Sequence, residues 1–254
     1  MSHPRLRRTA LLCCALGAAL VAGGAQAALV ETDNIILRAD AAFEPRALSK
    51  HRFEPIEIEG YFKIAAKDGG KPAALDRVVV GFDRDGRLSA GGLPSCLPEQ
   101  IANASTEEAR RICGGAIVGK GQIEALISLS TGPVPASSPL TIFNGPRQAG
   151  HPTVVLHAST TVPATQVYAI LVPVERQRGE FRYRATLDVP PIAAGLGAIT
   201  HVEVEVGRRF KVGGQRRSYV SARCSDGILR TFGGFTFEGG LVIEGAVEKF
   251  CRGR

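Results

Sequence analysis

The sequence predicts an all-β protein: a large β-sandwich, immunoglobulin-like or jelly-roll-like, with one short helical excursion. About a dozen short segments alternate apolar and polar residues or are rich in β-branched residues, as strands are. Turn-forming clusters separate them, drawn from 30 glycines and 15 prolines among 254 residues. Only one segment has the pattern of a helix, which favours a protein built from sheets alone.

The N-terminus has the pattern of an export signal. Three arginines within the first eight residues precede an apolar run over 10–22, and an Ala-x-Ala cleavage site ends at Ala27. We therefore expect a single secreted or periplasmic domain over 28–254, with residues 1–27 removed. An uncleaved anchor is the alternative, but the run is short for a membrane span. The Arg7-Arg8 pair leaves both general and twin-arginine export open, and no later segment is long and apolar enough to cross a membrane.

The leader carries part of the basic charge. The chain has a formal net charge of +7, and three of its basic residues lie in the leader, so the remainder has 28 basic against 24 acidic residues. Such a mildly basic exported domain, without a recognisable nucleic-acid-binding module, is not expected to bind nucleic acid.

Four cysteines follow the leader, which itself contains two more. An even number of cysteines in an exported protein indicates disulfides. Three pairings are possible, and we predict the pairing of sequence neighbours, Cys96 with Cys113 and Cys224 with Cys251. A structural zinc site is the alternative, but no C-x-x-C spacing supports it.

The first half of the chain is predicted to hold five strands, each ending near a glycine, proline or Asp-Gly cluster. They cover residues 34–38, 55–65, 75–82, 116–129 and 140–143. The segment 131–139 is rich in proline and serine and is predicted to be a loop. A split into two sandwiches at 133–139 is the alternative domain organisation.

The predicted helix covers 98–112. Ser105 has the character of an N-cap, Glu107 and Glu108 follow in the first turn, and basic residues lie at the C-terminal end. The cysteines on either side would attach this excursion to the sheets.

The second half of the chain is predicted to hold five further strands and a central hairpin. The strands cover 152–162, 167–174, 179–189, 229–237 and 241–250. In the hairpin, the segment 199–212 alternates valines and Phe210 with polar residues, and Gly213-Gly214 follows as a turn.

The register of this hairpin depends on the length of its loop. A two-residue turn would place Arg217 opposite Phe210 and would put charge on the core face. We therefore predict an odd-numbered loop that sets Ala222 against Val206 and Cys224 against Val204.

Several motifs occur together in this order: LDRVVVGFDRDGRL, GLPSC, ICGGAIVGKG, IFNG, LDVPPIAAGLGAIT and RRSYVSARCSDG. In these motifs the chain resembles a family of uncharacterised secreted bacterial proteins, over most of 75–251. The resemblance implies export and a four-cysteine framework, and it carries over no catalytic residue.

Three residues are candidates for hydrolytic catalysis. His157 and Ser159 share one face of a strand, and Asp188 lies downstream. A hydrolase would need all three to meet in space. The chain contains no G-x-S-x-G nucleophile motif, so ordinary sheet residues are the alternative.

Two patterns are candidates for metal binding. His201, Glu203 and Glu205 alternate on one strand face, and Asp83 and Asp85 precede a glycine, as in calcium loops. The alternatives are a solvated strand face, with Glu205 paired to Arg223, and an ordinary Asp-Gly hairpin turn. No cofactor is expected.

Basic residues gather in two stretches, and if these adjoin they form a surface for an anionic glycan or a lipid surface. The members are Arg182, Arg184, Arg209, Lys211, Arg216 and Arg217. Solvated charges that protect strand edges are the alternative.

Taken together, these patterns favour a non-enzymatic exported module that binds a ligand or associates with the bacterial envelope. An extracellular hydrolase acting on a polymer is the second hypothesis. A module dependent on calcium or zinc is the third.

Overall fold

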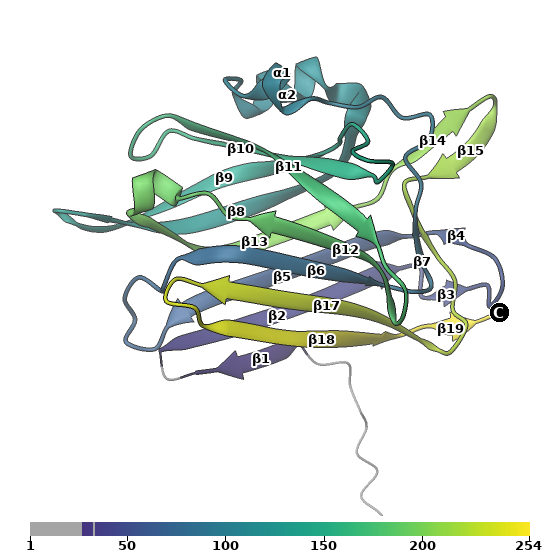
Figure 1. The fold of residues 1–254 in the computed structure, drawn as a ribbon, viewed down its shortest axis with the longest axis horizontal. Helices are drawn as coiled ribbons and strands as arrows, with labels where there is room; N and C mark the ends of the chain where they lie inside the picture. Colours follow the sequence, from purple (N-terminus) through teal and green to yellow (C-terminus); the bar gives the residue numbers. More distant parts are fainter. Residues whose placement is uncertain (1–26, 33) are drawn as a thin grey trace, which may run out of the picture.

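The computed structural model describes residues 27–32 and 34–254 and confirms the all-β class (Figure 1). Its main element is a twelve-stranded sheet whose neighbouring strands are all antiparallel. In sheet order the strands are β1 (Ala28–Glu31), β2 (Ile35–Glu44), β5 (Glu57–Ala66), β13 (Gly197–Val206), β8 (Ile117–Leu129), β9 (Gly132–Asn144), β10 (Thr153–Thr160), β11 (Gln166–Arg176), β12 (Phe181–Asp188), β6 (Leu75–Asp83), β17 (Ile228–Phe237) and β18 (Val242–Phe250).

The two layers of the structure are halves of this one sheet, which curls until its ends approach each other. Phe62 of β5 packs edge-on against Phe235 of β17, with 5.1 Å between ring centroids. Lys249 of β18 forms an ion pair with Asp40 of β2, at 2.7 Å between Nζ and Oδ1. Large twisted sheets curl in this way, and the curl encloses an apolar interior.

Short strands close one end of this interior. A three-stranded sheet of β4 (Glu54–Pro55), β16 (Val220–Ala222) and β7 (Gly86–Leu88) lies there, beside the parallel pair β3 (Ala47–Leu48) and β19 (Arg252–Gly253). Tyr219, only 2% exposed, packs in the apolar cluster that this sheet covers. Burial raises the pKa of its phenol, which therefore stays neutral. We call these strands and Tyr219 the plug.

Both predicted disulfides are confirmed. Cys96–Cys113 closes the helical excursion, and Cys224–Cys251 joins the chain beyond β16 to the C-terminal segment. The predicted helix is two helices, α1 (Pro98–Ile101) and α2 (Thr106–Ile112), followed by the 3₁₀ turn η1 (Gly114–Ala116).

The predicted N-cap of the second helix is also confirmed. Ser105 Oγ accepts a hydrogen bond from the Glu108 N–H at 3.3 Å, and the Glu108 carboxylate accepts one from the Ser105 N–H at 2.9 Å. This reciprocal capping box satisfies donors that a helix start would otherwise leave unpaired.

The predicted hairpin register was wrong. β14 (Arg209–Val212) and β15 (Gln215–Ser218) are joined by the two-residue turn Gly213-Gly214, and Arg217 lies opposite Phe210. Both glycines have positive φ, 56° and 78°, as this tight turn requires.

The physical reason is that the hairpin is not part of the main sheet. It projects beside the plug (Figure 1), so a charge opposite Phe210 is not buried in a core. Ala222 leaves the hairpin altogether and pairs with Gly86 rather than with Val206.

The predicted loop over 131–139 was also wrong, because β9 begins at Gly132. This part of β9 pairs with β8 only, since pairing with β10 begins at Leu140. Along a strand, every second residue directs its N–H group to the same side. The Gly145 N–H donates to the Thr153 carbonyl oxygen of β10, so odd-numbered residues of β9 direct their N–H groups to the β10 side. Proline has no N–H group, and at positions 133, 135 and 139 the missing N–H would point to the side of β9 where β10 does not pair. Proline is tolerated at such an unpaired edge.

Candidate functional site

An open groove of about 720 Å³ lies between the β14–β15 hairpin and the loop before β4. Its cationic side chains come from three strands: Arg87 of β7, Arg209 and Lys211 of β14, and Arg216 and Arg217 of β15. We call it the basic groove. Four of the six predicted anion-binding residues are therefore brought together, and Arg87 joins them from a distant part of the chain.

The base of the hairpin is attached to the helical excursion by Arg208. Its Nη1 donates to the carbonyl oxygens of Gly115 at 2.8 Å and Ile117 at 2.6 Å, and more weakly to that of Gly114 at 3.4 Å. Hydrogen bonds from a charged donor are stronger than neutral ones. This anchor holds the hairpin in place while its other basic side chains face solvent.

Phe53, in the loop before β4, forms part of the groove wall. The guanidinium carbons of Arg87, Arg182 and Arg223 lie 5.6, 5.3 and 5.3 Å from the centre of its ring. Cation–π attraction is expected at such distances. Phe53 thus brings Arg182 beside the groove, whereas Arg184 lies over the ring of Phe232, which is not in the groove wall.

Charge in the basic groove is not neutralised by the protein. Within residues 27–32 and 34–254, Arg223 pairs with Asp85, but none of the five groove cations lies within 4 Å of a carboxylate oxygen. Lys211 even lies directly opposite Arg216 in the hairpin. Like charges in this position destabilise a strand pair, so the groove has an uncompensated positive charge.

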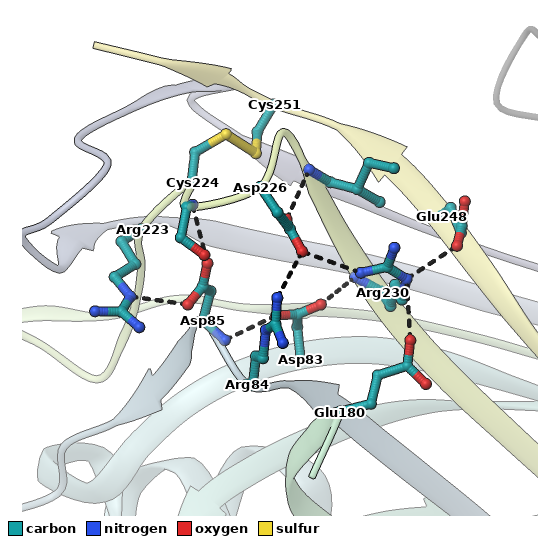
Figure 2. Close-up of polar contacts among 12 residues, drawn as sticks. Asp83, Arg84, Asp85, Glu180, Arg223, Cys224, Asp226, Arg230, Glu248 and Cys251 are labelled. Atoms are coloured by element: carbon teal, nitrogen blue, oxygen red, sulfur yellow. Dashed lines mark hydrogen bonds and ion pairs between the residues drawn. A yellow bond between two sulfur atoms is a disulfide. The ribbon is translucent and has the colours of Figure 1, made fainter.

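Asp83 and Asp85, the predicted calcium candidates, are saturated by donors from the protein (Figure 2). Asp83 accepts from the backbone N–H groups of Asp85 at 2.7 Å and Arg230 at 2.8 Å. Asp85 accepts from Arg223 Nε at 2.8 Å and the Ser225 N–H at 2.9 Å. All four carboxylate oxygens therefore have a structural role, and the calcium interpretation is not supported.

The pKa values of these two carboxyl groups are shifted in opposite directions. Burial raises the pKa of Asp83 and outweighs its two backbone hydrogen bonds. Burial would also raise the pKa of Asp85, but hydrogen bonds from Ser225 and Arg223 outweigh it and hold that pKa below its ordinary value. Asp85 thus remains ionised beside Arg223.

Arg230 extends this network beside the Cys224–Cys251 disulfide (Figure 2). It forms ion pairs with Glu248 at 2.9 Å, Glu180 at 3.1 Å and Asp226 at 3.4 Å. The network joins β17 and β18 to the segment before β12, so it stabilises the fold near the plug.

His201, Glu203 and Glu205 lie on the outer face of β13, and two of them pair with other side chains. His201 Nδ1 lies 3.7 Å from Glu124 Oε1, and Glu205 pairs with Lys120 at 3.1 Å. The predicted pair of Glu205 with Arg223 was wrong, because Arg223 turns towards Asp85. Elsewhere too, no group of three or more His, Cys, Asp or Glu in the described ranges is placed to hold a metal ion.

The three residues considered for catalysis are engaged separately. His157 is fully buried, its Nε2 lies 3.0 Å from the Ala104 carbonyl oxygen, and burial lowers its pKa. The Ser159 backbone pairs with Ser138 Oγ, and exposed Asp188 pairs with Arg77 Nε at 2.6 Å. His157 Nδ1 has no hydrogen-bond partner in the described part of the chain, so Asp188 does not orient it.

Phe53 and Arg87 are the groove residues that sequence reasoning missed. Neither belongs to an alternating pattern or a basic cluster, and no local signal distinguishes them. They become neighbours of the hairpin only because β4 and β7 pair with β16.

The predicted leader lies outside the described residues, apart from Ala27. In the described ranges, no helix combines the length and the apolar character that crossing a bilayer requires. Comparisons with protein-family models, with curated proteins and with solved structures found no match.

Proposed function

We propose that this protein is an exported, non-enzymatic binding module that holds an anionic glycan in the basic groove. The observation that carries the proposal is the set of five cationic side chains that line the groove together with Phe53 and have no carboxylate partner among the described residues. Guanidinium groups match the geometry of carboxylate and sulfate groups. The groove volume also falls in the range of ligand sites, about 300–1,000 Å³.

A glycan suits this groove better than a lipid surface does. Membrane-surface binding combines basic residues with exposed apolar ones that enter the bilayer. The large apolar side chains exposed in the described part of the chain lie elsewhere: Leu29, Leu97, Ile112, Val162, Leu196, Val242 and Phe250. The groove instead offers a half-buried aromatic ring, Phe53, beside which guanidinium groups gather, and these groups suit the carboxylates or sulfates of a glycan.

Export is supported by the covalent chemistry. Two disulfides indicate an oxidising compartment, outside the cytoplasm. β1 begins at Ala28, directly after the proposed cleavage site at Ala27, so cleavage there would leave every strand intact. The resemblance to secreted bacterial proteins points the same way, and retention at the envelope would place the groove near surface glycans.

The test is retention of the exported protein on immobilised heparin, with polygalacturonate as a carboxylated competitor and dextran as a neutral one. The variant Arg216→Glu/Arg217→Glu reverses two groove charges. The matched control, Arg38→Glu/Lys63→Glu, makes the same charge change on exposed, paired positions of β2 and β5.

We expect the groove variant to weaken binding at least tenfold and the control to weaken it far less. Polygalacturonate should compete and dextran should not. Equal losses in both variants would show that net charge alone drives retention, which would overturn the proposal. Binding to anionic phospholipid vesicles without binding to either polysaccharide would replace the glycan by a lipid surface.

A further inference from the structure

The interior of the curled sheet contains a cavity at the end opposite the basic groove. β13 connects these two ends, since η2 (Ile192–Gly195) precedes it and β14 follows it. In Figure 1, η2 is the green helical turn on the left, and the C-terminus is on the right. The cavity has a volume of about 140 Å³ and lies between both layers, with Phe62, Val78, Leu156, Ile170 and Val202 among its walls.

Small side chains create this space. Ala125 of β8, Ala136 of β9, Ala158 of β10 and Ala193 of η2 face the cavity from four elements. Protein interiors are otherwise packed closely, with few voids larger than a water molecule. The opposite end of the same interior is packed more tightly, because Tyr219 is buried there and the space left among the plug strands is only about 50 Å³.

The polar groups around the cavity are already engaged. Ser138 Oγ donates to the Ser159 carbonyl oxygen at 2.8 Å, and Tyr168 Oη donates to Gln166 Oε1 at 2.7 Å. No Asp, Glu, Lys, Arg or His side chain is among the residues described around it. An apolar cavity of about 150 Å³ in another protein stays dry and binds benzene, so a neutral hydrocarbon group matches both size and chemistry.

The backbone over the cavity is strained. Ala193 and Ala194 of η2 have φ of 49° and 55°, in the left-handed region that residues with a Cβ rarely adopt. Such strain concentrates at ligand clamps and switch segments. The Ala193 N–H has only a long hydrogen bond, 3.4 Å, to Tyr168 Oη.

Apolar side chains continue from the cavity to the surface. Leu196, directly after η2, is 49% exposed, and Val162, which lines the cavity, is 38% exposed. The route from solvent to the cavity is therefore apolar on the η2 side.

We propose that this cavity is a second binding site, which takes a neutral hydrocarbon group about the size of a six-carbon ring or chain. The group enters beside η2, and the strained Ala193–Ala194 backbone shifts to admit it. The site is separate from the basic groove and does not depend on the glycan proposal.

Toluene is a suitable probe, because it is neutral and has no affinity for a basic surface. Binding to the full chain is followed by changes in amide chemical shifts and by the melting temperature in saturating toluene. Ala158→Leu fills the cavity from a buried position near the C-terminal end of β10, and Ala136→Leu fills it from a half-buried position on β9. Ala65→Leu, on the exposed outer face of β5, is the control with the same added volume.

We expect toluene to raise the melting temperature of the wild-type and Ala65→Leu proteins and to shift amides of η2 and β8. Both filling variants should lose affinity at least tenfold. If Ala158→Leu does not fold, Ala136→Leu still tests whether filling the cavity removes toluene binding, because its position is only half-buried and accepts a larger side chain more easily. Absence of toluene binding to the wild type, or unchanged affinity in a folded filling variant, would overturn the proposal.

Discussion

The two ends of the curled sheet differ in how they are held together. The basic end carries the plug, the Cys224–Cys251 disulfide and the Arg230 network beside its surface charges. The apolar end carries unfilled volume beneath a strained 3₁₀ turn, and in the described ranges no disulfide reaches it. Stability is not uniform within a domain. Here the end tied by a disulfide and ion pairs displays the charge, and the end with strained backbone contains the cavity.

The largest effect on stability is expected at the basic end, from loss of the Cys224–Cys251 disulfide. Cys224→Ala/Cys251→Ala should lower the free energy of unfolding by about 3–4 kcal/mol, since the bond closes a loop of 27 residues and holds the plug. Denaturant titration measures this loss, and heparin affinity should fall as well. Cys96→Ala/Cys113→Ala, which opens the helical excursion on which Arg208 anchors the hairpin, is the comparison variant. Heparin affinity equal to that of the wild type in Cys224→Ala/Cys251→Ala would show that the plug does not support the groove.

The next effect concerns Asp85. Asp85→Asn should lower the free energy of unfolding at pH 7 by about 1–3 kcal/mol, because it removes a buried carboxylate that accepts from Arg223 and Ser225. The folded-state pKa of Asp85 is lowered. Its contribution is therefore present above the unfolded-state pKa of about 3.9 and is lost as pH falls through the lower folded-state value.

Denaturant titrations at several pH values test this sign. The difference between wild type and Asp85→Asn should be constant near neutrality and should shrink as the solution becomes acidic. A difference that grows towards acidic pH would contradict the role assigned to the ionised Asp85.

A smaller effect of opposite sign is expected at the apolar end. Ala193→Gly/Ala194→Gly should raise the free energy of unfolding by about 1 kcal/mol, because glycine adopts positive φ without steric strain. The control is Ala246→Gly in β18, where glycine should destabilise the strand. Destabilisation by both changes would remove the argument that η2 is strained.

The smallest effect on stability is expected in the basic groove. Arg216→Glu/Arg217→Glu should change the free energy of unfolding by no more than about 0.5 kcal/mol, because both side chains are exposed and pair with no carboxylate of the described chain. A thermal melt of the variant used in the heparin experiment measures this. A loss of several kcal/mol would assign the arginines a structural role and would weaken their use as binding probes.

Sequence reasoning was most successful where the determining contacts are local. The capping box at Ser105 involves residues three positions apart, and each disulfide joins neighbouring cysteines along the chain. Alternation predicted that His201, Glu203 and Glu205 share a face, and that face is the outer one. The prediction of a loop from proline and serine content failed at β9, because a strand tolerates proline where no neighbouring strand needs its N–H group, and the sequence does not show which strand lies alongside.

Patterns along the chain were enough to predict the all-β class, most of the strands and the helix cap, because periodicity, turn residues and caps act within a few residues of each other. The disulfides were predicted as pairs of successive cysteines, 17 and 27 residues apart. The two-residue turn of the hairpin depended on the tertiary structure, since the prediction placed the hairpin in the main sheet, whereas it forms a separate pair of strands in which Arg217 is exposed. The tertiary structure alone placed Phe53 and Arg87 in the basic groove and left a cavity among alanines from four elements. These features arise where strands distant in sequence meet, and their packing is not encoded in any single segment.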